Sequence, residues 1–355
     1  MLNSTDSVFN RAQSIVDADM EAENVDALLP VSSVIYSTLS VEGIQRLVVP
    51  GYNLPSPVSC IFFQRAVNDT YLLTSGGKRY ALRVSRFKWR SRAALSSELA
   101  ALRHLSDGGI EVAKPIARRD GKWITDVRAP EGIRYAVLFE WIDGVTPTYE
   151  DAAQAANYGK VLGRFHSVSD DLEQDDARTR MDLEHLLQSP LRLIGPHLED
   201  LPSMRARLDS LVDRLERRLS PATLQSLDWG FCHGDVWAEN AQLRGSQLVL
   251  FDFDCCGSGW RIYDIASYRW DARRQSAESL AWEPFIRSYL RERPRAAASL
   301  DLLGEFMILR HLWVTSLWII LTVETGTSYL PATFFEGLVP FCEQIEQDIE
   351  QGKRA

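Results

Sequence analysis

The sequence predicts an α+β fold in which a small β-rich lobe precedes a larger, mainly helical lobe. Short runs of β-branched and aromatic residues fill residues 58–142, whereas amphipathic helical patterns dominate residues 143–355. A short hairpin pattern around Gly245 interrupts these helices. With residues 1–57 as an N-terminal extension, we expect three segments, and we find no internal repeat.

The composition is that of an ordinary globular protein. Hydrophobic residues make up 45% of the 355 residues and charged residues 25%, so the chain can bury a sizeable core. The net charge of −9 weighs against nonspecific nucleic-acid binding and mildly favours a cationic or metal-associated ligand. We therefore expect no nucleic-acid partner.

Cysteine usage and hydropathy indicate a cytoplasmic location. The five cysteines include the adjacent pair Cys255 and Cys256 and form no CxxC arrangement, which favours reduced thiols and no zinc site. The first residues lack the basic start and apolar run of a signal peptide. The most apolar stretch, "LWVTSLWIILTV" from Leu312, is too short to cross a bilayer, so we expect a buried helix and no membrane partner.

The first lobe begins after a proline-rich boundary. The acidic N-terminal lead ends in "NLPSPVS", and the extension could be either an extra helix packed on the small lobe or a lid. The runs "SCIFFQRA", "TYLLTS" and "RYALRVS" predict three strands. Gly76 and Gly77 predict a hairpin turn between the last two of them.

A helix and two further strands complete the first lobe. Leu95, Leu99 and Leu102 recur at helical spacing and predict a helix after the third strand. The runs "GKWITDV" and "RYAVLFEWI" predict two more strands, and Asp143 with Gly144 closes the second of them.

The second lobe starts with a helix over residues 151–169. Its apolar stripe should comprise Ala155, Tyr158, Gly159, Leu162, Phe165 and His166. Residues 170–230 are expected to be largely helical and charged, and "AQLRGSQLVLFDFD" predicts a hairpin. From about residue 262 the pattern is again helical.

Polar residues gather beside this hairpin. The segment "FCHGDVWAEN", residues 231–240, has neither helical nor strand periodicity and places Asp235 and Asn240 in a predicted loop. Because side chains alternate along a strand, we expect Asp252 and Asp254 of "LVLFDFD" to point to one face and the phenylalanines to the other. Carboxylate and amide oxygens are hard ligands that suit Mg²⁺ better than zinc.

Such a set is what phosphoryl transfer requires. One aspartate orients the acceptor hydroxyl, while an asparagine and a second aspartate hold the magnesium that neutralises the phosphates. The spacing His233-Gly234-Asp235-x-x-x-x-Asn240 is that of a protein-kinase catalytic loop with glycine in place of arginine. The alternative is a chance match on a surface turn, which the "FDFD" that follows disfavours.

An arginine and a glutamate in the first lobe provide a second, independent test of the kinase-like interpretation. A kinase-like site needs a cation on a central strand, held by a glutamate of the next helix. Arg83 is the candidate cation, and Glu98 falls on the apolar stripe of its helix. A buried glutamate needs a partner, so we expect an ion pair between the two. The alternative is that Glu98 lies at the edge of the stripe and reaches water.

Three segments resemble the signatures of the aminoglycoside phosphotransferase and choline kinase superfamily: "HGDVWAEN", "LFDFD" and "GWRIYDIA". The segments "NDTYLL", "RYALRV" and "SELAALRHL" are similar to parts of its nucleotide-binding lobe, and the similarity runs from about residue 60 to residue 345. The resemblance implies a bilobal protein-kinase-like fold with ATP and Mg²⁺ as cofactors. It also implies transfer of the γ-phosphate to a hydroxyl group, with nucleotide binding in residues 58–142 and catalysis and acceptor binding in residues 143–355.

The resemblance assigns roles in the second lobe residue by residue. Asp235 would be the catalytic base, and Asn240 and Asp252 would be metal ligands. Asp264 of "YDIA" would support the catalytic loop. Asp254 is expected to support the metal site without binding the metal itself, because one position of a strand usually supplies the ligand.

The resemblance also implies nucleotide contacts in the first lobe. They would come from Arg83 with Glu98, from Asn68 and Thr70 in the turn over the phosphates, and from Glu140 and Ile142 in the hinge at residues 138–142. Arginine stands at position 83 where many relatives have lysine, and the turn "RAVNDTY" contains no glycine. Asp69 would have to face away from the phosphates, because like charges repel.

Other residues invite a functional interpretation that we do not adopt. His166 is expected to be a hydrogen-bonded core histidine, Trp313 and Trp318 are expected in the core, and Cys255 and Cys256 in packing. A tryptophan that faced the cleft could instead help form an acceptor pocket. The acidic C-terminal residues favour a solvated helix face, with binding of an amine-rich acceptor as the alternative: Glu343, Glu346, Asp348 and Glu350.

Three functional hypotheses follow from these residues. The first is an ATP- and Mg²⁺-dependent phosphotransferase whose acceptor is a hydroxyl of a small molecule, such as an aminoglycoside or an amino alcohol. The second is a protein Ser/Thr kinase resembling the bacterial stress-response kinase. The third is a nucleotide-binding module without turnover, which the complete set of Asp235, Asn240 and Asp252 disfavours. The sequence names neither the acceptor nor the oligomeric state.

Overall fold

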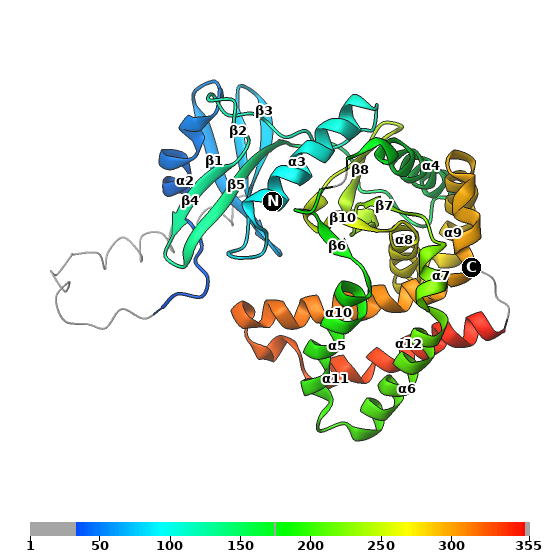
Figure 1. Cartoon of the computed structure of the whole chain (residues 1–355). Coiled ribbons are helices and arrows are strands. Elements are labelled where there is room, and N and C mark those ends of the chain that lie inside the picture. The colour runs from blue at the N-terminus through cyan, green and yellow to red at the C-terminus, as the bar shows by residue number, and fades with distance from the viewer. Residues whose placement is uncertain (1–32, 174, 352–355) are drawn as a thin grey trace, which may run out of the picture. The chain divides into compact units, whose positions relative to one another are not determined.

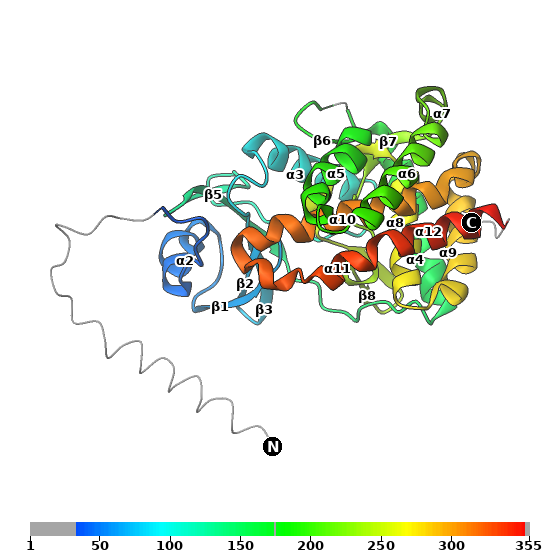
Figure 2. The ribbon, with the colours of Figure 1, turned by 90° about the horizontal axis from the view of Figure 1, so that it is seen from below.

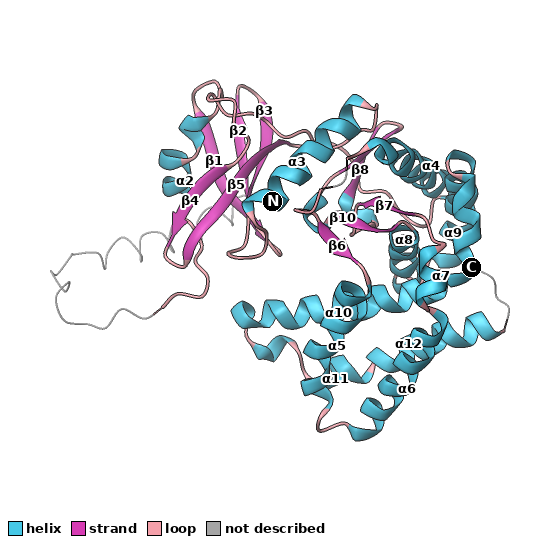
Figure 3. Ribbon diagram, viewed as in Figure 1, coloured by secondary structure: helices cyan, strands magenta, loops and turns pink. Residues whose placement is uncertain are grey.

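An antiparallel sheet comes first along the chain and a mostly helical part follows it (Figures 1 and 3). The computed structural model describes residues 33–173 and 175–351, and from Tyr36 onward the chain forms one compact unit. The predicted α+β class is confirmed. The N-terminal segment on which the signal-peptide prediction rests lies outside the described residues.

Five antiparallel strands form the first sheet, in the order β1-β2-β3-β5-β4. All five predicted strands are present, and β4 begins four residues later than its predicted run. Gly76 and Gly77 adopt positive φ angles of 56° and 75° at the β2–β3 hairpin, a conformation that glycine adopts without strain. The bounds are β1 Val58–Arg65, β2 Asp69–Ser75, β3 Lys78–Val84, β4 Thr125–Ala129 and β5 Gly132–Glu140.

Helices cover both faces of this sheet. On one face Tyr71, Leu82 and Leu138 are fully buried in a cluster that also contains Ile44 of helix α2 (Val41–Leu47) and Tyr52. The part of the N-terminal extension that the structure describes from Tyr36 onward is therefore packed on the small lobe. The division of the chain at residues 57 and 142 stays a prediction.

Helix α3 (Arg92–Asp107) covers part of the other face, and its sequence explains its position. The Ser91 side chain caps it by accepting a hydrogen bond from the Ala94 N–H at 3.1 Å. The predicted stripe of Leu95, Leu99 and Leu102 is buried, as is Glu98 between them. The apolar residues thus bring a carboxylate into the interior with them.

The helical part packs around its longest helix, α10, which contacts α5, α8 and α12 (Figures 1 and 2). Helices α4 and α9 approach closely at Gly159 and Gly163, where any side chain would collide with the backbone of α9. The predicted stripe of α4 is buried throughout. The helices are α4 Ala152–Val168, α5 Ser189–Ile194, α6 Pro202–Arg218, α7 Pro221–Gln225, α8 Ile262–Arg274, α9 Glu278–Glu292, α10 Leu303–Thr325, α11 Ala332–Glu336 and α12 Leu338–Glu350.

Two small sheets lie among these helices. The predicted hairpin is present as β8 (Ala241–Arg244) and β9 (Gln247–Leu250). A second sheet, in the order β6-β10-β7, was not predicted. Its strands are too short for an alternating pattern, and β10 reads "GSGW", whose glycines are needed because β6 approaches its backbone closely. The bounds are β6 Thr179–Met181, β7 Trp229–Cys232 and β10 Gly257–Trp260.

Helix α10 contains the apolar stretch from Leu312. The helical segment Pro294–Thr325 is long and apolar enough to span a membrane by length and composition, but 56% of its apolar window is buried inside the protein. This burial favours the predicted core helix. Trp313 is buried as predicted, whereas the prediction for Trp318 is wrong, because its side chain is 53% exposed.

Candidate active site

Asp235 and Asn240 contact each other directly. The loop that follows β7 ends in a short 3-10 turn at residues 238–240, which folds the asparagine back toward the aspartate. The Asn240 Nδ2 donates hydrogen bonds to the Asp235 backbone carbonyl at 2.9 Å and to the Asp235 Oδ2 at 2.8 Å. Because Nδ2 makes both bonds, the Asn240 Oδ1 is the amide atom left for a cation.

Asp264 of α8 holds the start of this loop. Its carboxylate accepts hydrogen bonds from the backbone N–H groups of His233 at 2.7 Å and Gly234 at 2.8 Å. Gly234 has φ +81°, and a side chain there would lie 2.2 Å from the Cys255 carbonyl oxygen. Glycine in place of arginine is therefore a steric requirement of this loop.

His166 stands behind Asp264. It is fully buried, with Nε2 3.0 Å from the Asp264 carboxylate and Nδ1 2.7 Å from the Tyr289 hydroxyl. Burial lowers the pKa of His166 to about 4, so the imidazole is neutral near pH 7. These contacts are those of the predicted hydrogen-bonded core histidine.

His233 ties the loop to the β8–β9 hairpin. Its Nε2 lies 3.0 Å from the Phe251 carbonyl oxygen, and its Nδ1 accepts a hydrogen bond from the Asp235 N–H at 3.3 Å. Burial lowers the pKa of His233, which suits a neutral ring that donates at Nε2 and accepts at Nδ1.

Asp252 and Asp254 do not share a strand, so that prediction is wrong. Strand β9 ends at Leu250, Asp252 adopts a left-handed conformation with φ 59° and ψ 58°, and residues 253–255 form a 3-10 turn. In this turn Phe253 is buried, and its ring centroid lies 6.0 Å from that of Phe165. Left-handed backbone at a residue other than glycine is uncommon and often marks a functional site.

Asp252 nevertheless lies within electrostatic range of the loop and of the first lobe. Solvent reaches its side chain, yet the surrounding protein displaces part of its hydration, and this loss is the main reason why its pKa rises to about 7. The carboxylate of Asp254 raises the pKa further, while Arg83 opposes the shift and Asp235 adds to it. A cation bound among these acids would relieve the repulsion.

Asp254 is buried and contacts the segment between β3 and α3. Its Oδ2 accepts a hydrogen bond from the Trp89 Nε1 at 2.5 Å, and its backbone carbonyl accepts one from the Arg90 Nε at 2.7 Å. Its Oδ1 is buried and has no hydrogen-bond partner among the described residues. These contacts are compatible with the expectation that Asp254 supports the metal site without binding the metal itself.

The predicted ion pair between Arg83 and Glu98 is present. The Arg83 Nη2 lies 2.8 Å from each oxygen of the Glu98 carboxylate, and both residues are buried. Burial disfavours both charges: it raises the pKa of Glu98 against the effect of Arg83. At Arg83 burial is the largest single cause, but Glu98, Asp254 and Asp252 together outweigh it and raise the pKa. The Arg83 Nε is buried and has no hydrogen-bond partner among the described residues.

The turn between β1 and β2 is held by side chains in place of glycine. The Asn68 Oδ1 accepts a hydrogen bond from the Arg86 N–H at 3.0 Å, and Thr70 lies opposite Arg83 in the β2–β3 register. Asp69 is fully buried, with its Oδ2 2.9 Å from the Arg134 Nη2. This contact turns Asp69 away from the site, as the predicted phosphate contacts require.

The predicted hinge, residues 138–142, comprises the end of β5 and the two residues after it. Glu140 is the last residue of that strand, its N–H donates to the Lys114 carbonyl at 2.9 Å, and its side chain is exposed. Ile142 lies two residues later and is half-buried. The adenine-binding roles of both residues stay predictions.

An apolar strip near Arg83 was missed at the sequence level. Ile61, Leu72 and Ala81 are cross-strand neighbours on one face of β1, β2 and β3, and Ala81 shares this face with Arg83. Ile61 is 54% exposed although it lies on a strand of the small lobe. An exposed apolar strip beside a buried cation suits the flat face of a nucleobase.

Arg310 is the second residue that was missed. It lies in α10, is 3% exposed, and its Nη2 donates a hydrogen bond to the Asp235 Oδ1. The signal in the sequence was one arginine within the apolar run "GEFMILRHLWV", because a buried cation must be paired. Nothing in the local pattern pointed to Asp235 as the partner.

The acidic C-terminal residues lie on a partly exposed helix face, where they form ion pairs. The Arg207 Nε lies 2.9 Å from Glu343, the Arg214 Nε lies 2.9 Å from Glu346, and the Arg273 Nη1 lies 3.0 Å from Asp348. The side chain of Glu350 lies outside the described residues.

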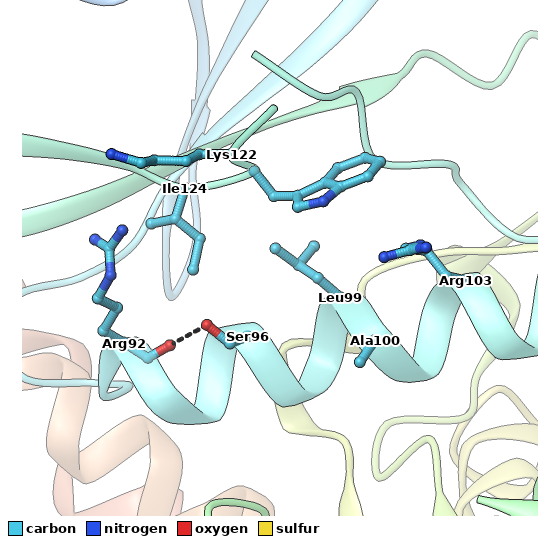
Figure 4. Close-up of a pocket in the computed structure, with 8 residues that line it drawn as sticks. Arg92, Ser96, Leu99, Ala100, Arg103, Lys122 and Ile124 are labelled. Atoms are coloured by element: carbon cyan, nitrogen blue, oxygen red, sulfur yellow. Dashed lines mark hydrogen bonds between the residues drawn. The ribbon is translucent and has the colours of Figure 1, made fainter. Parts of the chain in front are cut away.

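A groove of about 260 Å³ lies on α3 (Figure 4). It is lined by Arg92, Ser96, Leu99, Ala100, Arg103, Lys122, Trp123 and Ile124. None of the predicted site residues is among them, since Glu98 belongs to the side of α3 that meets Arg83. This groove is therefore separate from the candidate active site.

The residues present fit a nucleotide with a divalent cation. The Arg83 Nε and the Asp254 Oδ1 are a buried donor and a buried acceptor without partners among the described residues. Asn240 and Asp252 offer oxygen ligands of the kind that Mg²⁺ prefers. The orphaned donor and the repelling acids are both features that an anionic ligand with its cation would compensate.

Comparisons with known proteins agree with this geometry. The family model of APH, the phosphotransferase enzyme family, matches residues 62–303. An uncharacterized protein of Deinococcus radiodurans is 36% identical over 318 residues, which cover 88% of this chain and 92% of that protein. Homoserine kinase of Neisseria meningitidis is 28% identical over 236 residues, which cover 65% of this chain and 72% of that enzyme.

A solved structure shows the same fold. The amicoumacin kinase hAmiN in complex with AMP-PNP, Ca²⁺ and Ami superposes with a TM-score of 0.69 at 22% identity and covers 86% of this chain and 93% of that one. Relatives thus bind ATP analogues together with divalent cations. The family match, which spans more than half of the chain, shows that this protein belongs to the APH phosphotransferase family and is a kinase of hydroxyl-bearing small molecules.

Proposed function

We propose that this kinase transfers the γ-phosphate of ATP, with Mg²⁺, to a hydroxyl group of a small amino alcohol or a related acceptor. The observation that carries the proposal is the convergence of Asp235 and Asn240, in direct contact, with Asp252 and Arg83 in electrostatic range. The Arg83–Glu98 pair and the exposed apolar strip of Ile61 add a phosphate anchor and a surface for the base.

Asp235 acts on the acceptor in this proposal. Its carboxylate accepts the hydroxyl proton while the acceptor oxygen forms a bond to the γ-phosphorus and the bond from that phosphorus to the bridging oxygen breaks. ADP is the leaving group. Asn240 and Asp252 would hold Mg²⁺, which supplies positive charge against the phosphates when bound. Arg83, held by Glu98, would bind phosphate oxygens through its free Nε.

The paired C-terminal acids favour small acceptors over amine-rich antibiotics. Glu343 and Glu346 already bind Arg207 and Arg214, so these acids do not offer free carboxylates to the amines of an aminoglycoside. The acceptors named for relatives, homoserine and amicoumacin, differ widely in size. We therefore rank small amino alcohols and hydroxy amino acids first and aminoglycosides second.

The test is phosphate transfer from labelled ATP to a panel of acceptors. The panel contains amino alcohols, choline, hydroxy amino acids, sugars, aminoglycosides and a generic protein substrate, which covers the protein-kinase alternative. We expect transfer to one small-molecule class and none to protein. Asp235→Asn should lower the rate by about two orders of magnitude or more, because it removes the proton acceptor. A variant with the wild-type rate would show that Asp235 is not the base.

One further expectation stays a prediction, and one alternative is disfavoured. A cytoplasmic location would give the enzyme its ATP and Mg²⁺, and cell fractionation tests it. The module without turnover has no support in the structure, because a framework that fixes Asp235 and Asn240 through Asp264 has no use in binding alone.

A further inference from the structure

The catalytic loop contains no cation of its own. From His233 to Asn240 it reads "HGDVWAEN", with two acids and neither lysine nor arginine. Asp252 and Asp254 add negative charge beside it. A carboxylate in such surroundings is repelled by its neighbours and is free to turn away unless another group holds it.

Arg310 supplies that group from helix α10. Its Nη2 donates to the Asp235 Oδ1, and its Nη1 donates to the Gly234 carbonyl oxygen at 3.2 Å. The other carboxylate oxygen, Oδ2, accepts from Asn240 at 2.8 Å. Each oxygen of Asp235 is thus held by a different segment of the chain, and the guanidinium spans both the side chain and the backbone of the loop.

Two tryptophans fix the guanidinium in turn. The Arg310 Cζ lies over the rings of Trp270 and Trp313, 5.3 Å from each centroid. The indole N–H groups are also engaged, because Trp270 donates to the His311 Nδ1 at 3.3 Å and Trp313 donates to the His185 Nε2 at 3.0 Å. A long flexible side chain is thereby held in one geometry.

We propose that Arg310 is a positioning residue of this active site, which orients Asp235 and balances its charge in place of a cation in the catalytic loop. The inference rests on the proposed role of Asp235. A lysine cannot replace Arg310, because a single ammonium group cannot reach both the Asp235 carboxylate and the Gly234 carbonyl with the geometry of a planar fork.

Chemical rescue of the full-length Arg310→Ala variant tests this proposal. We expect kcat for phosphate transfer to fall by about 100-fold while the KM for ATP stays close to that of the wild type, because the aspartate is misplaced and the nucleotide site is intact. Guanidinium chloride at low, non-denaturing concentration should restore much of the rate by occupying the space beside Trp270 and Trp313. Methylammonium should not restore it, and Arg310→Lys should remain impaired.

The matched control is Arg218→Ala, which removes a partner of the buried Glu305 on the same helix. It breaks another arginine–carboxylate pair, one that does not include Asp235, so it should lower stability and leave kcat close to wild type. An Arg310→Ala protein that is folded and retains the wild-type kcat would overturn the proposal. So would a folded but impaired variant that guanidinium fails to rescue.

A binding measurement separates this proposal from the proposed function. Guanidinium should change the tryptophan fluorescence of Arg310→Ala in a saturable way, and should bind more weakly to the Arg310→Ala, Asp235→Asn double variant. If the wild-type enzyme transfers no phosphate, the proposed function fails while this titration still tests the contact. A titration that is equal with and without the Asp235 carboxylate would overturn the positioning role. Should Arg310→Ala not fold, Arg310→Lys replaces it, and a wild-type kcat in that variant would be the contradicting result.

Discussion

Two arginine–carboxylate pairs of the candidate site differ in which partner faces the site. In the small lobe the arginine, Arg83, is the proposed phosphate anchor, and Glu98 holds it. In the helical part the carboxylate of Asp235 is the proposed proton acceptor, and Arg310 holds it. The first pair joins residues 15 apart in the sequence and the second joins residues 75 apart. The same interaction thus positions a cation in one lobe and an anion in the other.

The largest effect should come from breaking the pair in the small lobe. Arg83→Met leaves Glu98 buried and unpaired, and we expect the free energy of unfolding to fall by about 3–5 kcal/mol. Urea unfolding measures it. Arg83→Lys is the matched control and should keep most of the stability and nucleotide affinity, because one ammonium group can face Glu98. A loss below about 1 kcal/mol in Arg83→Met would contradict a buried charged pair.

The next largest effect should come from Asp264, which holds the loop that carries Asp235. Asp264→Asn places an amide N–H₂ against the backbone donors of His233 and Gly234, so we expect a loss of about 2 kcal/mol in stability and a lower kcat. Asp271→Asn on the same helix is the comparison. Its carboxylate accepts from the Tyr149 hydroxyl and the Gln275 amide, and it reaches the loop only indirectly, because Tyr149 accepts from the Ala238 N–H. Unfolding and transfer rates are measured for both, and equal losses would show that Asp264 has no special role.

The stability of the region around Arg310 should also depend on pH. The two tryptophans that pack on Arg310 donate hydrogen bonds to neutral histidines, His311 and His185. Burial lowers the pKa of His185 to about 4 and of His311 to about 3, whereas both are near 6.5 in the unfolded chain. The unfolded state binds more protons below pH 6.5. The contribution of the two neutral histidines to the free energy of unfolding is therefore complete above about pH 6.5 and is lost as the pH falls toward 4.

Each histidine should contribute about 2 kcal/mol to this loss. Urea unfolding near pH 7 and near pH 5 measures it, with His311→Asn as the comparison, which should show a shallower dependence. Identical pH profiles for the two proteins would refute the assignment to His311.

A smaller effect concerns the acids between the two pairs. The pKa of Asp252 is raised to about 7, mainly by partial loss of hydration and then by Asp254, so protons compete with a cation there. We expect the affinity for Mg²⁺ to rise about tenfold between about pH 6 and pH 8 and then to flatten. Calorimetry of Mg²⁺ binding measures it, and Asp252→Asn should bind weakly with little dependence on pH. An increase that continues unchanged in Asp252→Asn would point to another group.

The smallest effect should come from the exposed pairs of α12. Glu343→Gln breaks the contact with Arg207 on α6 and should lower the free energy of unfolding by no more than about 1 kcal/mol, since water and salt screen such pairs. Phosphate transfer should be unchanged. A large loss of activity would instead revive a role for the C-terminal acids in acceptor binding.

Local patterns predicted most of the first lobe. The strand runs, the glycine turn and the leucine spacing of α3 were each legible within a few residues, and the Arg83–Glu98 pair followed because β3 and α3 are consecutive elements. The error at Asp252 has a local cause as well. An alternating pattern in "LFDFD" is compatible with a strand and with a turn, and the structure has a turn in which Phe253 is buried.

The sequence by itself determined the fold class, and it predicted the catalytic loop and oxygen ligands suited to Mg²⁺, because short-range spacing and residue type are sufficient for these predictions. Only the tertiary structure decided that Arg310 meets Asp235, that the C-terminal acids are already paired and that Trp318 is exposed. The physical reason is distance along the chain. A buried charge shows that it needs a partner, but the packing of helices remote in sequence determines which partner it receives.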